Sequence, residues 1–170
     1  MKHWQCRQSR MPQSAESYYN LFNGKNCGSN KFSIFLRYKK TPLDKLKTYT
    51  DKRGSLTLVE GGHEIPFAIT RAYWIYDVPA GEERGKHANK ISYQYLIAVS
   101  GSVDICLENK SGRTMYHLDS KEKGLLVPPE TWNELTNFSP DAVLLVLASH
   151  TYDASTYINS HQEFLKYIGK

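Results

Sequence analysis

One histidine and three amide side chains form the most chemically distinctive pattern in this sequence of 170 residues. His87 and Asn89 are separated by one residue, and Gln94 and Asn133 follow farther along the chain. Side chains two positions apart on a strand share a face, so we expect His87 and Asn89 to point the same way. An imidazole can exchange protons near neutral pH, and amides offer donors and acceptors to hydroxyl and carbonyl groups. The pattern predicts a site for a polar, sugar-like ligand.

The same residue types argue against a metal site. Zinc, iron and manganese are bound by imidazole, carboxylate or thiolate groups, whereas amides are weak ligands without charge to offset a divalent ion. One histidine cannot hold a catalytic metal by itself, so we expect neither a metal nor another cofactor. Cys6, Cys27 and Cys106 lack the spacing of metal ligands. We interpret them as reduced thiols of a cytoplasmic protein.

The elements that must position these side chains are short strands. Segments rich in aromatic and β-branched residues are bounded by Gly, Pro, Asn, Asp or Ser, which is typical of an all-β barrel or sandwich. They cover residues 54–60, 65–78, 92–100, 102–109, 114–119, 123–129 and 142–149. Only residues 155–169 have the spacing of an amphipathic helix, with Gly169 as its stop. The sequence therefore predicts an all-β domain over residues 41–170 with a short C-terminal helix.

The net charge of +5 is distributed unevenly. Residues 1–40 hold eight Lys or Arg and one acidic residue, and residues 41–170 hold fourteen Lys or Arg against sixteen Asp or Glu. We interpret residues 1–40 as an N-terminal extension, poorly ordered in its first part, attached to a nearly neutral domain. The domain lacks the basic stripe with interleaved aromatics of a nucleic-acid binder, and no apolar run approaches the roughly 20 residues of a membrane span. We expect a cytoplasmic protein that binds neither nucleic acid nor membranes.

The spacing of the histidine and the amides resembles the two motifs of the cupin barrels. Residues 81–101 have the frame of the first motif, from one glycine to the other, with His87, Asn89 and Gln94 at its three ligand positions. Asn133 stands at the histidine position of the second motif. Three of the four metal-ligand positions are therefore amides. The resemblance implies a cupin-type jelly-roll barrel whose interior binds an organic ligand.

Longer segments resemble one cupin family, the dTDP-4-keto-6-deoxyglucose 3,4-ketoisomerases, also grouped as WxcM-like proteins. The resemblance runs from about residue 48 to the C-terminus and depends on "DKRGSLTLVE", "IPFAITRAYWIYDV", "GEERGKHANK", "LLVPPETWNEL" and "LLVLASHTYDASTYI". It implies an isomerase that moves the ketone of a dTDP-linked 4-keto-6-deoxy sugar from C4 to C3 through an enediol, in deoxysugar biosynthesis for surface polysaccharide. It also implies a homodimer with exchanged N-terminal strands.

The resemblance implies a role for several residues. His87 would be the catalytic acid or base, and Tyr73 would stabilise or protonate the enediolate. Arg53 and Arg84 would contact the sugar or the diphosphate, because guanidinium groups bind such anions in a bidentate manner.

The amides mark where this chain departs from the family pattern. It reads "HANK" where the family usually reads "HAHK", and Asn133 replaces the histidine that usually follows the tryptophan of the second motif. Asn89, Gln94 and Asn133 are expected to bind the substrate, because they occupy the ligand positions of the cupin frame.

Two other functions stay open at this point. One is a noncatalytic cupin that binds a nucleotide sugar. The other is an enzyme resembling the 3,5-epimerases, which usually need a histidine paired with an aspartate, and the motif strands contain no such pair.

Overall fold

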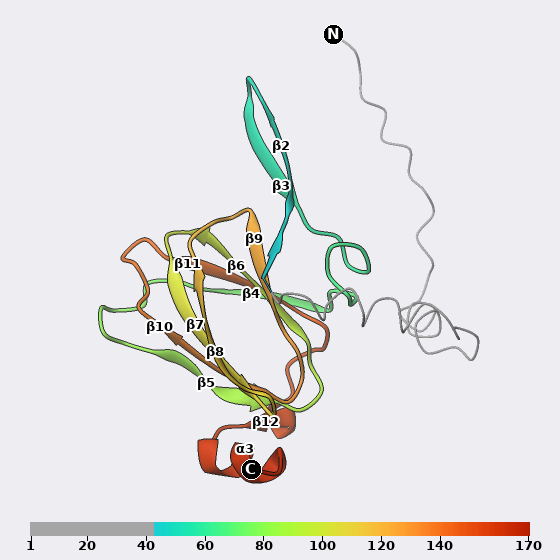
Figure 1. Ribbon diagram of the computed structural model, residues 1–170. Coiled ribbons are helices and arrows are strands. Elements are labelled where there is room, and N and C mark those ends of the chain that lie inside the picture. The colour runs from blue at the N-terminus through green and yellow to red at the C-terminus, as the bar shows by residue number, and fades with distance from the viewer. Residues whose placement is uncertain (1–42) are drawn as a thin grey trace, which may run out of the picture. The chain divides into compact units, whose positions relative to one another are not determined.

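The computed structural model describes residues 43–170 (Figure 1). Two five-stranded antiparallel sheets face each other. The first, called the β4 sheet, has the order β1 (Leu43–Lys45), β9 (Lys123–Val127), β6 (Gln94–Ser100), β11 (Val143–Ala148) and β4 (Arg71–Ile75). The second, called the β5 sheet, has the order β12 (Tyr157–Ile158), β5 (Arg84–Asn89), β10 (Thr131–Thr136), β7 (Val103–Asn109) and β8 (Gly112–Leu118). This architecture confirms the predicted all-β, cupin-type fold.

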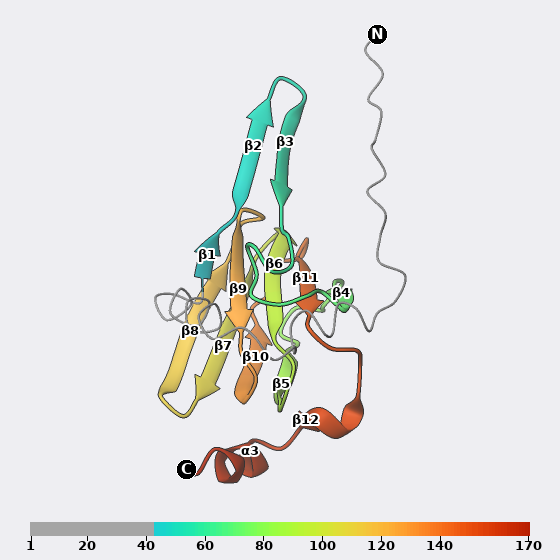
Figure 2. The same cartoon turned by 90° about the vertical axis from the view of Figure 1, so that its right-hand side faces the viewer.

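A hairpin and two short helices complete the described chain. Strands β2 (Lys47–Asp51) and β3 (Gly54–Leu58) pair only with each other, and their hairpin extends beyond the two sheets (Figure 2). The C-terminal segment contains the 3₁₀ helix η1 (Ala154–Thr156) and the helix α3 (His161–Tyr167). In residues 43–170, no helix combines the length and the apolar character that crossing a membrane requires.

The core lies between the sheets because each strand alternates an inward apolar residue with an outward one. Its buried side chains come from both sheets: Leu96, Ala98, Leu125, Val127, Leu144 and Val146 from one, and Val103, Ile105, Leu107, Leu118 and Leu135 from the other. A second apolar cluster covers the outer face of the β4 sheet. There Ile65 and Phe67 pack against Tyr95, Ile97 and Leu147.

Two predicted segments are shorter in the structure. Of residues 65–78 only Arg71–Ile75 form a strand, because Pro66 has no N–H for a ladder and the preceding residues cover the outer face of the sheet. The predicted helix over 155–169 is confirmed only for His161–Tyr167. Ser160 caps it by accepting a hydrogen bond from the Glu163 N–H, so the chain before it is free to form η1 and β12.

The predicted segments leave out the two strands that carry His87 and Asn133. β5 and β10 contain few apolar residues, so their alternation is hidden in the sequence. The N-terminal extension predicted over residues 1–40 lies outside the described residues.

Candidate active site

Polar side chains gather at one end of the space between the sheets. In the β4 sheet, Arg71 and Gln94 both pair with Ala148, from opposite sides. In the β5 sheet, His87 pairs with Asn133, and the last two-residue strand brings Tyr157 beside Asn89. Side chains in one row across a sheet share a face, so the two sheets present these groups to each other.

His87 is held in one protonation state by its surroundings. Its Nδ1 lies 3.0 Å from the carbonyl oxygen of Gly85, which can only accept, so Nδ1 carries the hydrogen. The Nε2 atom is buried without a hydrogen-bond partner. Burial lowers the pKa of His87, although the Gly85 carbonyl opposes this in part. The imidazole is therefore neutral at pH 7, with a free lone pair on Nε2.

Tyr157 is the side chain that contacts the His87 ring. The two rings meet edge to face with centroids 5.0 Å apart. The Tyr157 hydroxyl accepts a hydrogen bond of 3.1 Å from Nη2 of Arg71. A residue near the C-terminus is thus linked to strands of both sheets.

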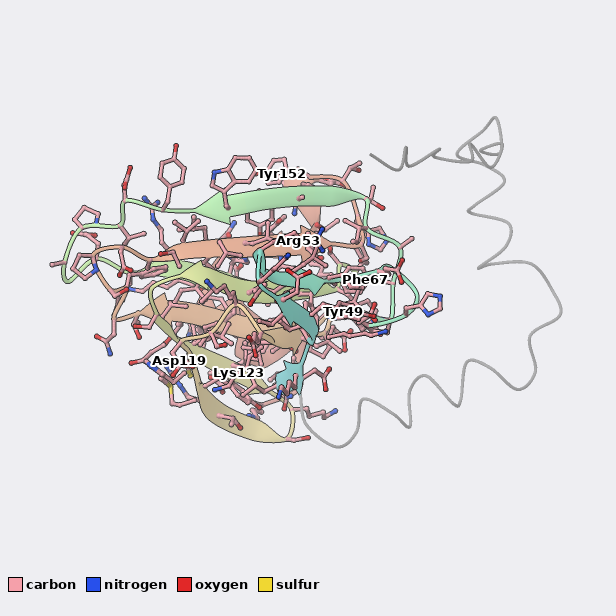
Figure 3. All side chains as sticks on the ribbon, turned by 90° about the horizontal axis from the view of Figure 1, so that it is seen from above. Tyr49, Arg53, Phe67, Asp119, Lys123 and Tyr152 are labelled. Carbon is pink, nitrogen blue, oxygen red and sulfur yellow. The ribbon has the colours of Figure 1, made fainter. Side chains whose placement is uncertain are left out.

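Arg71 is a cation that lies among tyrosine side chains. Its guanidinium lies 5.0 Å from the ring centroid of Tyr73 and 5.6 Å from that of Tyr152. Figure 3 labels Tyr152 beside the edge of the β4 sheet. Within residues 43–170 Arg71 forms no salt bridge, and its buried Nε has no hydrogen-bond partner. The arrangement leaves a positive charge available to an anionic or polar ligand.

The Tyr73 hydroxyl stays protonated. Burial, helped by neighbouring Tyr157 and opposed by Arg71, raises the pKa of Tyr73 to about 12. A protonated phenol next to a guanidinium can donate a hydrogen bond to an oxygen that gains negative charge.

The three amides divide into two kinds. Asn89 and Asn133 are buried and use their amide groups within the protein; Nδ2 of Asn133, for example, donates to the His87 carbonyl at 3.0 Å. That bond lies at a bulge where Gly85 has φ 76°, and a Cβ there would come within 2.6 Å of the Asn133 side chain. Nε2 of Gln94, by contrast, is buried without a partner. Gln94 is therefore the amide with an unused donor.

No metal centre is formed by these residues. Across residues 43–170, no three His, Cys, Asp or Glu side chains come together in a way that could hold a metal ion.

The chain is similar to known proteins in both sequence and fold. The family model described as FdtA: WxcM-like, C-terminal matches residues 39–169. The chain belongs to the WxcM-like family. A curated member, TDP-4-oxo-6-deoxy-alpha-D-glucose-3,4-oxoisomerase of Aneurinibacillus thermoaerophilus, is 42% identical over 124 residues, which cover 73% of this chain and 89% of that protein.

Solved structures of 3,4-ketoisomerases match the fold closely. The enzyme from Helicobacter canadensis has a TM-score of 0.73 and 38% identity, covering 75% of this chain and 96% of its own. A variant of QdtA from Thermoanaerobacterium thermosaccharolyticum, bound to TDP-4-keto-6-deoxyglucose, has a TM-score of 0.72 and 37% identity, covering 74% and 91%. A dTDP-4-dehydrorhamnose 3,5-epimerase from Bacillus anthracis, at 18% identity, shares the fold alone.

The structure of this WxcM-like chain does not bring the two predicted arginines to His87. Arg53 lies at the turn of the β2–β3 hairpin (Figure 3), where it is paired with Asp51 and its side chain is 84% exposed. Arg84 begins β5 and is exposed.

Three residues near His87 were missed by the sequence reasoning. Arg71 precedes the recognised Tyr73 by two positions, so alternation along a strand could have found it. Tyr152 and Tyr157 lie within the "SHTYDASTYI" ending of the family. Tyr157 contacts His87, and Tyr152 contacts Tyr157, only because the C-terminal segment returns to β5, which no local sequence pattern predicts.

Proposed function

We propose that this WxcM-like chain is a 3,4-ketoisomerase that acts on a TDP-linked 4-keto-6-deoxy sugar, with His87 as its acid and base. The observation that carries the proposal is the buried, unpartnered Nε2 of a neutral His87 opposite the Arg71–Tyr157 pair. Of the relatives that are 37–42% identical to this chain over 73–74% of its length, one is a TDP-4-oxo-6-deoxy-alpha-D-glucose-3,4-oxoisomerase and another is bound to TDP-4-keto-6-deoxyglucose.

The proposed reaction uses His87 as a base, opposite the Arg71 cation and the phenol of Tyr73. Nε2 of His87 takes the proton from C3 of the sugar, the electron pair forms the C3–C4 double bond, and the C4 oxygen becomes an oxyanion. Arg71 and the protonated Tyr73 stabilise that charge. The proton then returns to C4, and the proton of the C3 hydroxyl passes to the C4 oxyanion, which leaves the ketone at C3 and a hydroxyl at C4. Nothing is oxidised or reduced overall, so the step needs no redox cofactor.

Several residues are proposed to bind the substrate. Gln94 has a free donor that suits a sugar hydroxyl or carbonyl. Arg84 is exposed at the start of β5, the strand that carries His87, and suits the diphosphate. Asn89 and Asn133 support the site from behind, through hydrogen bonds within the protein.

A homodimer in the cytoplasm is proposed as the working form. The hairpin exposes Tyr49 (50%) and Leu56 (60%), and the edge strand β4 exposes Trp74 (61%). Apolar side chains on a free hairpin and on a sheet edge favour pairing with a second copy. Arg53 lies at the turn of the exposed hairpin. In a dimer it would contact the site around His87 of the second copy. Light scattering at micromolar concentration should give twice the chain mass, and a monomer would contradict the dimer.

The test is incubation of the purified chain with TDP-4-keto-6-deoxyglucose and a 3-aminotransferase that consumes the 3-keto product. Amino-sugar formation that persists in a chelator is expected. Binding of the sugar nucleotide without product would favour a noncatalytic cupin. Deuterium uptake from heavy water at C5 would favour an epimerase.

A further inference from the structure

The strand that carries Tyr157 is attached to β5 by few backbone contacts. β12 has two residues, and its register with β5 consists of Tyr157 opposite Asn89 and Ile158 opposite Ala88. One more backbone bond, of 2.9 Å, joins the Lys90 N–H to the Thr156 carbonyl. So short a strand needs side-chain bonds to hold one position.

Asn89 supplies these bonds. Its Oδ1 accepts from the backbone N–H groups of Ile91 at 3.0 Å and Ser92 at 2.7 Å, which fixes the side chain to the turn after β5. Its Nδ2 donates to Oγ1 of Thr156 at 3.0 Å, and that hydroxyl donates to the Asp153 carbonyl at 2.8 Å. The side chain is buried, with 6% of the residue exposed, so water does not compete.

We propose that Asn89 is a positioning residue that holds Tyr157 against His87 through the hydroxyl of Thr156. Thr156 immediately precedes Tyr157, so the bond fixes the backbone one residue away from the phenol. The phenol meets the His87 ring and accepts from Arg71, and both contacts depend on its position. The catalytic part of this inference rests on the proposed function. Asn89 then acts on the sugar through Tyr157 rather than by touching it.

The C-terminal helix packs against the β5 sheet through its own apolar contacts. The position of Tyr157 can therefore change while the helix stays folded. Phe164 and Ile168 of this segment pack against Ala88 and Trp132 in a buried cluster. Loss of the Thr156 bond should therefore loosen Tyr157 while the helix stays in place. This makes the inference testable without unfolding the chain.

The test compares T156V with T156S in the full-length protein. Valine keeps the shape of threonine but removes the hydroxyl that Asn89 reaches, whereas serine keeps the hydroxyl. We expect T156V to lower kcat roughly 10-fold or more, because a misplacement of about 1 Å can cost about 100-fold in rate. KM and the affinity for TDP should change little, and T156S should retain wild-type kcat. Wild-type kcat in T156V would overturn the inference.

A fluorine label gives a readout that does not depend on turnover. With 3-fluorotyrosine at position 157, the ¹⁹F resonance should shift or broaden in T156V and N89A but not in T156S. An unchanged resonance in T156V would refute the positioning role. A wild-type chain that does not convert the sugar would refute the proposed function, and this resonance would still decide whether Asn89 positions Tyr157.

Discussion

The two ends of the barrel interior are built differently. At one end the inward positions hold Arg71, Tyr73 and Gln94 on the β4 sheet, opposite His87 on the β5 sheet. At the other end the same two sheets present aliphatic side chains: Ile75, Ala98, Val103, Ile105, Leu135 and Leu144. Each inward row along β4 or β6 thus changes from polar to apolar within three alternate positions.

The difference predicts that the apolar end gives stability and that the polar end carries the proposed chemistry. Three buried donor or acceptor atoms at the polar end have no partner in the protein: Arg71 Nε, His87 Nε2 and Gln94 Nε2. An unpaired buried polar group costs about 1–3 kcal/mol, so the apolar end must offset that cost by close packing. Substitutions at the two ends should therefore affect different measurements.

The largest effect is expected from His87→Asn at the polar end. The change removes the only titrating base with a free lone pair in this cluster, and general acid–base groups typically contribute about 100- to 10,000-fold in rate. Turnover of TDP-4-keto-6-deoxyglucose should fall by that factor, while calorimetry should give nearly unchanged TDP affinity. Retention of more than about a tenth of the activity would show that His87 is not the base.

Leu144→Ala at the apolar end should give the opposite pattern. Leu144 is fully buried in the core cluster, so its truncation leaves a cavity and should lower the free energy of unfolding by about 2–5 kcal/mol. The kcat per folded molecule should stay near the wild-type value, measured well below the melting temperature. A large fall in kcat without loss of stability would contradict the division between the two ends.

The pH profile sharpens the description of the polar end. Because burial lowers the pKa of His87, the neutral base persists below the ordinary histidine value of 6.5. The acid limb of kcat/KM should therefore lie below pH 6.5, with the rate falling as protons are added. Tyr73, whose pKa is about 12, should add no alkaline limb between pH 7 and 10. An acid limb above pH 6.5 would show that the imidazole is not desolvated as the structure describes.

The smallest effect is expected outside the barrel, at the pair His161 and Glu108. Nε2 of His161 lies 2.8 Å from the Glu108 carboxylate, and this hydrogen bond lowers the pKa of Glu108. A carboxyl with a lowered folded pKa stabilises the fold above its ordinary value of 4.5, and that stabilisation is lost as the pH falls through the folded value. Glu108→Gln should cost roughly 1 kcal/mol at pH 6 and almost nothing at pH 3, because the pair is partly exposed. Chemical denaturation at both values checks this, and an equal loss at both would exclude the ion pair as its cause.

The sequence by itself determined the fold class and predicted His87 as the base. Alternating aromatic and β-branched residues predict strands of a barrel, because the period of two reflects a sheet with one buried face. The spacing around His87 and the family segments locate His87 and Tyr73 within the motif strands. These signals are local, so they can be recognised without knowing how the sheets meet.

Only the tertiary structure decided which groups surround that base. Arg71 and Tyr157 are 86 positions apart, and they meet because the chain returns to β5 after the last strand of the opposite sheet. The amides could not be told apart by type, since Asn89 and Gln94 offer the same donors and acceptors. Asn89 has its amide satisfied by Ile91, Ser92 and Thr156, whereas Gln94 keeps a free donor. That difference depends on which backbone groups lie within about 3 Å, a property of the closed barrel rather than of any segment.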